Sequence, residues 1–265
     1  MRKNARPATG RRRIGKLSLV FGSVIATLLA TSGVAFADPP QALDWSAPWP
    51  DRIYEPAFDY DSDGCYPTPA IGVDGTIAPG LNTTGAVNGS CHDPWDLDNT
   101  NAYSRVKCNN GWCAYIYGLY FEKDQAVAGS GLGGHRHDWE HVVVWVADSS
   151  TYPQYVSVSK HGNYDIYDRS QLAWDETGVH PKVIYHKDGI GTHCFRIAGM
   201  TEAPENDKGT WQYPPLVGWD NYPAGLRDKL TSADFGEAQF GLRDSAFWWE
   251  LSKAKPAAIT FDPNA

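Results

Sequence analysis

The chain has 265 residues, a length that suits one domain of moderate size or, less favoured, two small ones. Its formal charge is −8, with 31 acidic against 23 basic side chains. This acidity argues against a nucleic-acid-binding protein, which needs basic surface to neutralise phosphates, and against attachment through anionic lipid alone. Divalent cations and uncharged or sugar-bearing surfaces remain as candidate partners.

The first 37 residues are typical of a secretory signal peptide. Residues 1–16 carry seven Lys or Arg and no acid, residues 17–36 are mostly apolar, and residues 35–37 (AFA) fit a small-x-small cleavage site. A transmembrane anchor is the alternative, since the apolar run is nearly long enough to cross a bilayer. The Gly, Ser and Thr residues in that run and the cleavage signature favour the signal peptide.

Export would leave residues 38–265 as a single mature domain with 16 basic and 31 acidic side chains. The export route stays open, because residues 11–16 (RRRIGK) are a loose match to a twin-arginine signal. We therefore expect a secreted, extracellular protein.

Short strands separated by turn residues dominate the pattern after a loop-rich stretch at residues 38–110. Residues 114–121 (AYIYGLYF) are apolar on both faces, as in a central strand. Residues 155–159 (YVSVS) alternate, which predicts one solvent-exposed face. Further strands are expected at 141–146, 182–185 and 193–198.

Helical periodicity is found only late in the chain. Residues 224–230 follow a proline, and residues 246–254 follow a cap at Asp244 or Ser245 and stop before Pro256. Several closely spaced strands with few helices predict a mainly β fold, a β-sandwich with peripheral helices.

Five cysteines follow the leader, and in an exported protein they favour disulfides. Cys108 and Cys113 bracket a turn sequence, Asn-Asn-Gly-Trp, so a bridge across a hairpin is expected. Cys65 and Cys91 then form the other pair, and Cys194 is left over. A structural zinc site is the alternative, but no second closely spaced cysteine pair completes it.

The most concentrated chemistry lies in residues 134–140 (GHRHDWE). On a regular strand His135 and His137 would share one face, and Asp138 and Glu140 the other. A regular strand therefore cannot direct His135, Asp138 and Glu140 at one ion, whereas a loop entering a strand can, and the Gly-rich residues 129–134 supply that loop. Imidazole with carboxylates predicts a divalent-cation site, the oxygen ligands favouring harder ions.

Two other interpretations of this heptapeptide stay open. One is enzymatic, acid–base chemistry: His135-x-His137-x-x-Glu140 partly matches the metal motif of cupin enzymes, and His-x-His-Asp partly matches the opening of some metallo-hydrolase motifs. The other is a charged strand end, with its carboxylates paired to Arg136. Neither a nucleophile elbow nor a phosphate-binding glycine loop is present.

Three further segments are weaker candidates. Residues 59–64 (DYDSDG) resemble the opening of an EF-hand loop, but Ala70 stands where the bidentate Glu belongs, which favours turn chemistry. The acidic residues 93–98 are interpreted in the same way. Trp211, in a Pro-rich loop, is the best candidate for an exposed indole that stacks on sugar or lies at a membrane interface.

The heptapeptide resembles the signature of the necrosis- and ethylene-inducing peptide 1-like proteins, also called the Nep1-like or NPP1 family. The resemblance extends to about residues 59–254. It includes residues 63–67 (DGCYP), residues 114–124 (AYIYGLYFEKD), residues 142–145 (VVVW), the pair Thr192-His193, Trp219-Asp220, residues 234–238 (DFGEA), Phe247 and Leu251.

This resemblance implies a two-sheet antiparallel β-sandwich, similar to actinoporins and fungal lectins, and a secreted cytolysin-like virulence factor or elicitor without enzymatic activity. Family members typically bind a divalent cation, Mg or Ca, and glycosyl inositol phosphorylceramides, the glycosylated sphingolipids of plant plasma membranes. We accordingly expect a monomer that makes peripheral membrane contact, causes membrane damage and necrosis, and binds no nucleic acid.

The resemblance also implies roles for individual residues. Asp124, His135, Asp138 and Glu140 match the cation ligands, and His193 matches a loop histidine beside the cavity. With His193 we group three more candidate ligand-binding residues, to which the resemblance gives no specific role: Arg136, His137 and Trp211.

The chain departs from the common family pattern at three places. The loop from Asp124 to His135 is about three residues longer, and the Cys108–Cys113 pair matches a subtype with a second disulfide. Residues 187–191 (KDGIG) lack the tryptophan that cytolytic members often carry in this loop. A non-toxic, lectin-like glycan-binding protein on the same scaffold is therefore the alternative function, ahead of a cupin-like secreted metalloenzyme.

Overall fold

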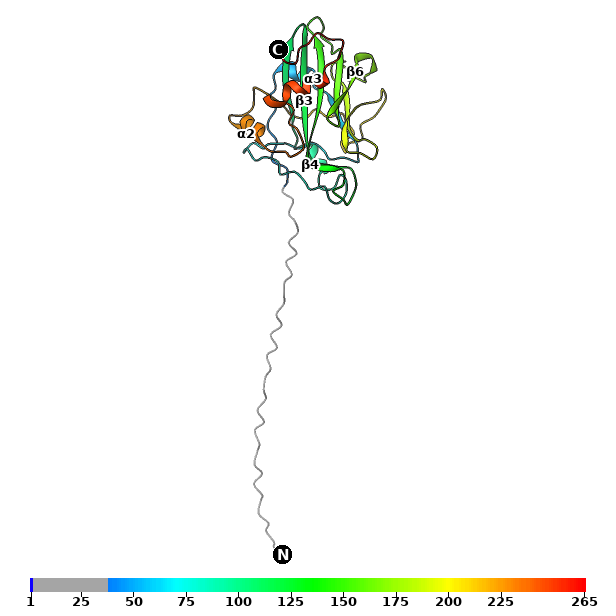
Figure 1. Cartoon of the computed structure of the whole chain (residues 1–265). Coiled ribbons are helices and arrows are strands. Elements are labelled where there is room, and N and C mark those ends of the chain that lie inside the picture. The colour runs from blue at the N-terminus through cyan, green and yellow to red at the C-terminus, as the bar shows by residue number, and fades with distance from the viewer. Residues whose placement is uncertain (2–37) are drawn as a thin grey trace. The chain divides into compact units, whose positions relative to one another are not determined.

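Two β-sheets form the folded part of the computed structural model, which describes Met1 and residues 38–265 (Figure 1). The larger sheet has the strand order β6-β5-β4-β3-β2-β9, and the smaller has the order β1-β7-β8. The strands are β1 Ala57–Tyr60, β2 Ala102–Asn109, β3 Trp112–Gln125, β4 Gly134–Ala147, β5 Tyr155–Lys160, β6 Asn163–Asp168, β7 Lys182–Lys187, β8 His193–Ile197 and β9 Leu216–Gly218.

Helices are few and short in the described residues. They are α1 Trp49–Ile53, α2 Leu226–Ser232 and α3 Asp244–Ala254, with 3-10 turns at Pro94–Leu97 and Arg169–Gln171. The predicted mainly β, two-sheet fold with peripheral helices is confirmed. Most strand pairs are antiparallel, but β1 with β7 and β2 with β9 pair in parallel.

The leader prediction for residues 1–37 lies outside the described residues, apart from Met1. Within residues 38–265, no helix has both the length and the apolar character needed to cross a bilayer.

The central strand β3 is buried on both faces, as its sequence predicted. Tyr115 and Tyr117 pack into the core between the two sheets, whereas Ile116 and Tyr120 pack into a second core on the other face of the large sheet. Helix α3 lies across that second face (Figure 1) and contributes its own buried apolar side chains to the same core.

The prediction that one face of β5 is exposed to solvent is wrong, because helix α3 covers that face. Ser157 and Ser159 are buried, and their hydroxyls form hydrogen bonds within the protein. The Ser157 hydroxyl donates to the Ala254 carbonyl at the end of α3 and accepts from the indole of Trp145. Small polar residues on a strand can thus pack beneath a helix when each hydroxyl finds a partner.

The predicted disulfides are present, but the predicted helix cap is not. Helix α3 begins after Arg243 and makes no side-chain cap, so the predicted caps at Asp244 or Ser245 are wrong. Both predicted disulfides are confirmed, Cys65–Cys91 and Cys108–Cys113. The second bridge spans the β2–β3 hairpin, whose Asn110 and Gly111 both adopt positive φ, as tight hairpin turns require.

The buried Glu55 generates a prediction about pH. Its carboxyl oxygen Oε1 has no hydrogen-bond partner among the described residues, and burial raises its pKa from 4.5 to about 8. The folded protein therefore holds a proton that the unfolded chain releases above pH 4.5. The stability that this proton provides is complete below pH 4.5 and is lost as the pH rises to about 8.

We expect Glu55→Gln to become more stable than the wild type as the pH rises, by up to about 1.4 kcal/mol per pH unit within that window. Urea unfolding at a series of pH values measures the difference. The exposed Glu176→Gln is the control and should track the wild type. A constant difference between Glu55→Gln and wild type across this range would contradict the prediction.

Candidate functional site: a carboxylate and histidine cavity

The heptapeptide 134–140 forms the first half of strand β4. The prediction that a loop presents its side chains is therefore wrong. Strand β3 continues to Gln125, and its backbone pairs with β4 as far as Gly134. The ladder omits one pair, Glu122 with His137, and His137 adopts φ 61 in the left-handed region. This local irregularity breaks the alternation of the strand, so His135 and Asp138 both line one cavity.

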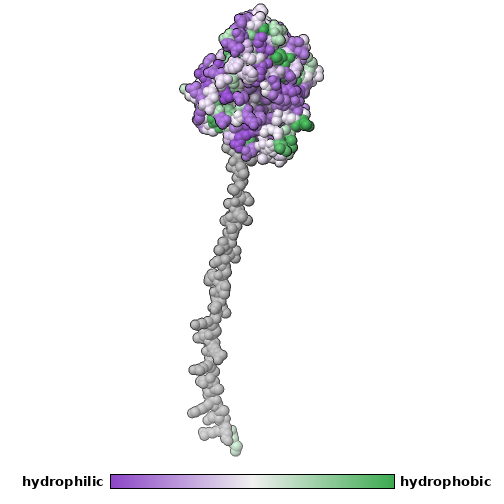
Figure 2. Space-filling model, viewed as in Figure 1, coloured by the Kyte–Doolittle hydropathy of each residue, from purple (hydrophilic) through white to green (hydrophobic). Residues whose placement is uncertain are grey.

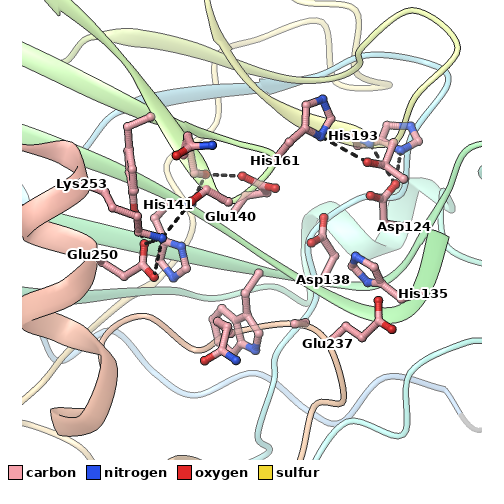
Figure 3. A pocket seen from close by; sticks show the side chains of 18 residues that line it. Asp124, His135, Asp138, Glu140, His141, His161, His193, Glu237, Glu250 and Lys253 are labelled. Carbon is pink, nitrogen blue, oxygen red and sulfur yellow. Dashed lines mark hydrogen bonds and ion pairs between the residues drawn. The ribbon is translucent and has the colours of Figure 1, made fainter. Parts of the chain in front are cut away.

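Three side chains from β3 and β4 meet in this cavity. Asp124 is the ladder partner of His135, and the ligand atoms of Asp124, His135 and Asp138 all lie within 4.8 Å of one another. Figure 3 shows His135 and Asp138 directed toward Asp124. The sequence placed these residues on a loop and a separate strand, whereas the structure brings them together across one β-ladder.

Each of the three side chains is oriented by a neighbour. The Nδ1 of His135 lies 2.6 Å from the carbonyl of His137, which directs Nε2 into the cavity. The Tyr185 hydroxyl donates to Asp138 Oδ2 at 2.9 Å. Such outer partners fix the geometry of metal ligands in proteins.

Asp124 is oriented by His193, the predicted histidine beside the cavity. The backbone N–H and the Nδ1 of His193 contact the same oxygen, Asp124 Oδ1, at 2.9 and 2.7 Å. The other oxygen is thereby left for a cation. Gly64 makes this arrangement possible, because a Cβ at this position would lie 3.0 Å from both the His193 and Tyr185 rings.

Glu140 lines the same cavity but stands outside the three-residue group. It lies two residues beyond Asp138 on β4 and accepts a hydrogen bond from the Ser159 hydroxyl. In Figure 3 it lies between the Asp124 group and the residues of α3. Its predicted role as a cation ligand stays a prediction.

Burial of several carboxylates in one place raises their proton affinity. Burial, and then the charge of Asp124, raise the pKa of Asp138 to about 7. Burial and the charge of Asp138 raise the pKa of Glu140 well above its ordinary value. Burial alone would lower the pKa of His193, but the hydrogen bond and charge of Asp124 raise it overall.

A bound cation would relieve this repulsion, and the donor set fits one. Carboxylate oxygens with one imidazole suit Mg²⁺, Ca²⁺ or Mn²⁺. The cavity has a volume of about 210 Å³, so Asp124, His135 and Asp138 could hold an ion and leave coordination positions open for water or a hydroxyl group.

The neighbouring Arg136 and His137 are not brought to the cavity. The Arg136 guanidinium reaches the opposite way, to the Pro79 carbonyl and the side chain of Asn82. His137 is nearly buried, its Nδ1 lies 2.6 Å from the Tyr120 hydroxyl, and burial lowers its pKa to about 4. We leave both residues out of the proposed site.

Trp211 also lies away from the cavity, and the prediction of an exposed indole there is wrong. Its half-buried ring packs on Ile184 of β7 and on Ala173 and Ala198 beside the small sheet, with the Lys182 ammonium 5.1 Å from the ring centre. The loop on which it lies covers an apolar strand face, which the Pro-rich sequence did not reveal.

The two acidic segments serve the fold. Asp59 is fully buried and accepts from the backbone N–H groups of Glu205 and Asn206. Asp93 and Asp96 cap a 3-10 turn. Neither segment belongs to a cluster of potential metal ligands among the described residues. The interpretation as a turn holds for residues 93–98, whereas Asp59 lies in strand β1.

Several residues that line the cavity or hold its carboxylates carry little signal in the sequence. Ser159 and Tyr185 hold the two carboxylates of β4, His161 lies at the rim, and Glu250 and Lys253 come from α3. No spacing in the chain relates them to the heptapeptide. The one signal in the sequence is the alternation of Ser157 and Ser159 in β5, which could have suggested hydrogen-bond partners on that face of the sheet.

A model of the NPP1 family, described as necrosis inducing protein, matches residues 51–254. The chain belongs to this family. It is 31% identical over 241 residues to NLP effector protein 10 of Phytophthora capsici, covering 87% of this chain and 96% of that protein. It is 34% identical over 196 residues to the necrosis-inducing protein NPP1 of Phytophthora nicotianae, covering 73% and 77%.

Solved structures of the family share the fold. Necrosis and Ethylene inducing Protein 2, from the agent of cocoa's witches broom disease, aligns with a TM-score of 0.69 at 24% identity, covering 82% of this chain and 95% of that one. NLPPya in complex with mannosamine aligns at 0.64 and 29% identity, covering 81% and 96%. The non-toxic HaNLP3 protein aligns at 0.65 and 25% identity, covering 82% and 99%.

The Tyr185–Asp138 hydrogen bond yields a prediction about cation affinity. Tyr185→Phe keeps the ring that stacks on Phe121 but removes the donor to Asp138. We expect the dissociation constant for Ca²⁺ or Mg²⁺, measured by calorimetric titration, to rise roughly ten-fold or more.

The matched control is Tyr117→Phe, which also deletes a buried hydroxyl, here one bonded to the Asp51 carbonyl far from the cavity. Both variants should lose about 1 kcal/mol of stability. Only Tyr185→Phe should lose cation affinity; equal affinities in the two variants would contradict the assignment.

Proposed function

We propose that this protein is a secreted, non-enzymatic, cation-dependent binder of glycosylated sphingolipid headgroups on plant plasma membranes, and that binding leads to membrane damage and necrosis. The observation that carries the proposal is the group of Asp124, His135 and Asp138, whose ligand atoms lie within 4.8 Å on one cavity wall. Export rests on the composition of residues 1–37 and on the similarity to effector proteins.

The cation supplies the attraction between an acidic protein and a sugar. Sugar hydroxyls are ordinary oxygen ligands for a hard divalent ion. The family member NLPPya has been solved with mannosamine, which supports a sugar as the ligand of this scaffold. The polar cavity wall that continues from Asp138 past Glu140 to Glu250 and Lys253 provides further donors and acceptors for hydroxyl groups.

Membrane contact is supported by apolar side chains on the two loops that flank Asp124. Ile190, between β7 and β8, is 96% exposed, and Leu132, between β3 and β4, is 75% exposed. The visible surface is otherwise mostly hydrophilic, with apolar groups in small patches (Figure 2). Ile190 lies in the loop that lacks the tryptophan, so an aliphatic side chain would make the apolar contact here.

A non-toxic glycan-binding protein is the second candidate function. It is favoured by the similarity to HaNLP3, which is described as non-toxic, and by the absence of tryptophan from residues 187–191. A cupin-like enzyme finds less support, because that motif needs both histidines, and His137 contacts Tyr120 and Phe235 on the other side of β4.

The cation requirement is tested on vesicles that contain or lack plant glycosyl inositol phosphorylceramide, with Ca²⁺ or with a chelator. We expect wild-type protein to bind the glycolipid vesicles only with the cation. Asp124→Ala and Glu140→Ala should reduce binding at least roughly ten-fold, since each removes a carboxylate from the cavity. The exposed Asp228→Ala is the control.

Infiltration of the same proteins into leaves separates the two candidate functions. Necrosis from wild type that is lost in Asp124→Ala and Glu140→Ala supports the toxin. Necrosis that survives both substitutions would refute the cation-dependent mechanism. Glycolipid binding without necrosis would favour the non-toxic binding protein.

The exposed Ile190 gives a separate prediction. Ile190→Ser should leave cation and headgroup binding unchanged but reduce dye release from glycolipid vesicles by about ten-fold or more, because transfer of one such side chain out of water provides about 1.5–3 kcal/mol. Val73→Ser, which changes a half-exposed residue elsewhere, is the control. Equal dye release from wild type and Ile190→Ser would exclude membrane contact through this loop.

A further inference from the structure

A second cluster of potential metal ligands surrounds the unpaired cysteine. His161, Asp188 and Cys194 place one ligand atom each within 4.8 Å of one another. They come from three places in the chain: the β5–β6 turn, the residue after β7, and strand β8. Cys194 is the one cysteine outside the disulfides, and it is fully buried.

Two distances at this cluster, one between Cys194 and its neighbour His186 and one between His161 and Asp188, are close to those between zinc ligands. With Zn–S near 2.3 Å and Zn–N near 2.0 Å, tetrahedral sulfur and nitrogen ligands lie about 3.5 Å apart, and nitrogen and oxygen ligands about 3.3 Å apart. His186, the ladder partner of Cys194, has its Nε2 3.6 Å from the Cys194 sulfur. His161 Nε2 lies 3.0 Å from Asp188 Oδ2.

The backbone and a neighbouring hydroxyl fix the direction of His161. The turn from β5 to β6 consists of His161 and Gly162, both with positive φ, as in the tight turns that match the twist of a hairpin. Thr192 Oγ1 lies 3.3 Å from Nδ1 of His161, which leaves Nε2 for a metal. An oriented histidine of this kind is a regular feature of metal sites.

We propose that His161, Asp188 and Cys194 form a zinc site beside the carboxylate cavity, with His186, next to the Cys194 sulfur, as the candidate for a fourth ligand. On binding, the Cys194 thiol gives its proton to solvent, and the thiolate forms the Zn–S bond. Sulfur and two imidazoles select zinc over Ca²⁺ and Mg²⁺. The oxygen-rich Asp124 group has the opposite preference.

One positive charge competes for the site. The Lys160 ammonium lies 3.4 Å from Asp188 Oδ2, the same oxygen that faces His161. Lys160 has a second partner, Asp165, at 3.8 Å. When zinc takes Asp188, the ammonium therefore keeps a carboxylate, and 36% of the Lys160 side chain is exposed to solvent.

The position of the site gives zinc a structural consequence. The ion would join the β5–β6 turn of the large sheet to β7 and β8 of the small sheet. His161 and Thr192 also line the carboxylate cavity, so zinc would fix one wall of it. This inference does not depend on the proposed function, because it concerns a different ion and different ligands.

Cobalt substitution tests the site in the full mature chain, with both disulfides formed and Cys194 kept reduced. Co²⁺ bound by a thiolate gives a charge-transfer band in the near ultraviolet, and the Asp124 group contains no sulfur that could produce it. We expect the band in wild type and its loss on addition of one equivalent of Zn²⁺. Asp124→Ala should keep the band.

Four variants and one control test the site. The band should disappear in Cys194→Ser, and His161→Ala, at an exposed turn position that tolerates substitution, should lose stoichiometric zinc binding. Thr192→Val should weaken zinc binding by roughly ten-fold. Asp188→Asn should weaken it as well, whereas Asp228→Asn, which changes an exposed carboxylate of α2 outside the cluster, should not.

Absence of the thiolate band from wild type, or equal zinc affinity in wild type and His161→Ala, would overturn the proposal. Either result would leave the proposed headgroup binding untouched, because vesicle binding is measured with Ca²⁺ and depends on Asp124 and Glu140. Conversely, vesicle binding could fail while the cobalt band is present, so the two proposals are judged separately.

Discussion

The antiparallel ladder between β3 and β4 constrains both cores and the site. Both strands are 14 residues long, and their side chains fill an apolar core on each face of the large sheet. Since a ladder fixes which residues stand opposite each other, Asp124 must face His135. The left-handed residue at His137 then brings Asp138 to the same side. A slip in register would separate these side chains and exchange the residues that fill the two cores.

Around this ladder, the polar groups of the cavity are held by elements far away in the chain. His193 of β8 holds Asp124, Tyr185 of β7 holds Asp138, and Ser159 of β5 holds Glu140. These hydrogen bonds hold the carboxylates near one another despite their repulsion. A rigid, oxygen-rich site of this kind favours a cation because the cost of gathering the charges has been met by folding.

The β5–β6 turn and the start of β8 connect the two clusters of potential ligands. His193 orients a carboxylate of the first cluster, and the adjacent Cys194 supplies the sulfur of the second. Consecutive strand residues point to opposite sides, so a single short strand can serve both clusters. The donor types separate them, oxygen at Asp124 and sulfur at Cys194.

The sequence by itself determined the mainly β class, the doubly buried β3 and the two disulfides, because these depend on local pattern and on residue chemistry. Tertiary structure decided what local pattern cannot contain. It placed the heptapeptide in a strand, turned His137 away from His135, covered Ser157 with α3, and half-buried Trp211 on the small sheet. Each of these outcomes depends on which distant segment packs alongside, and such long-range contacts leave no periodic signal in the chain.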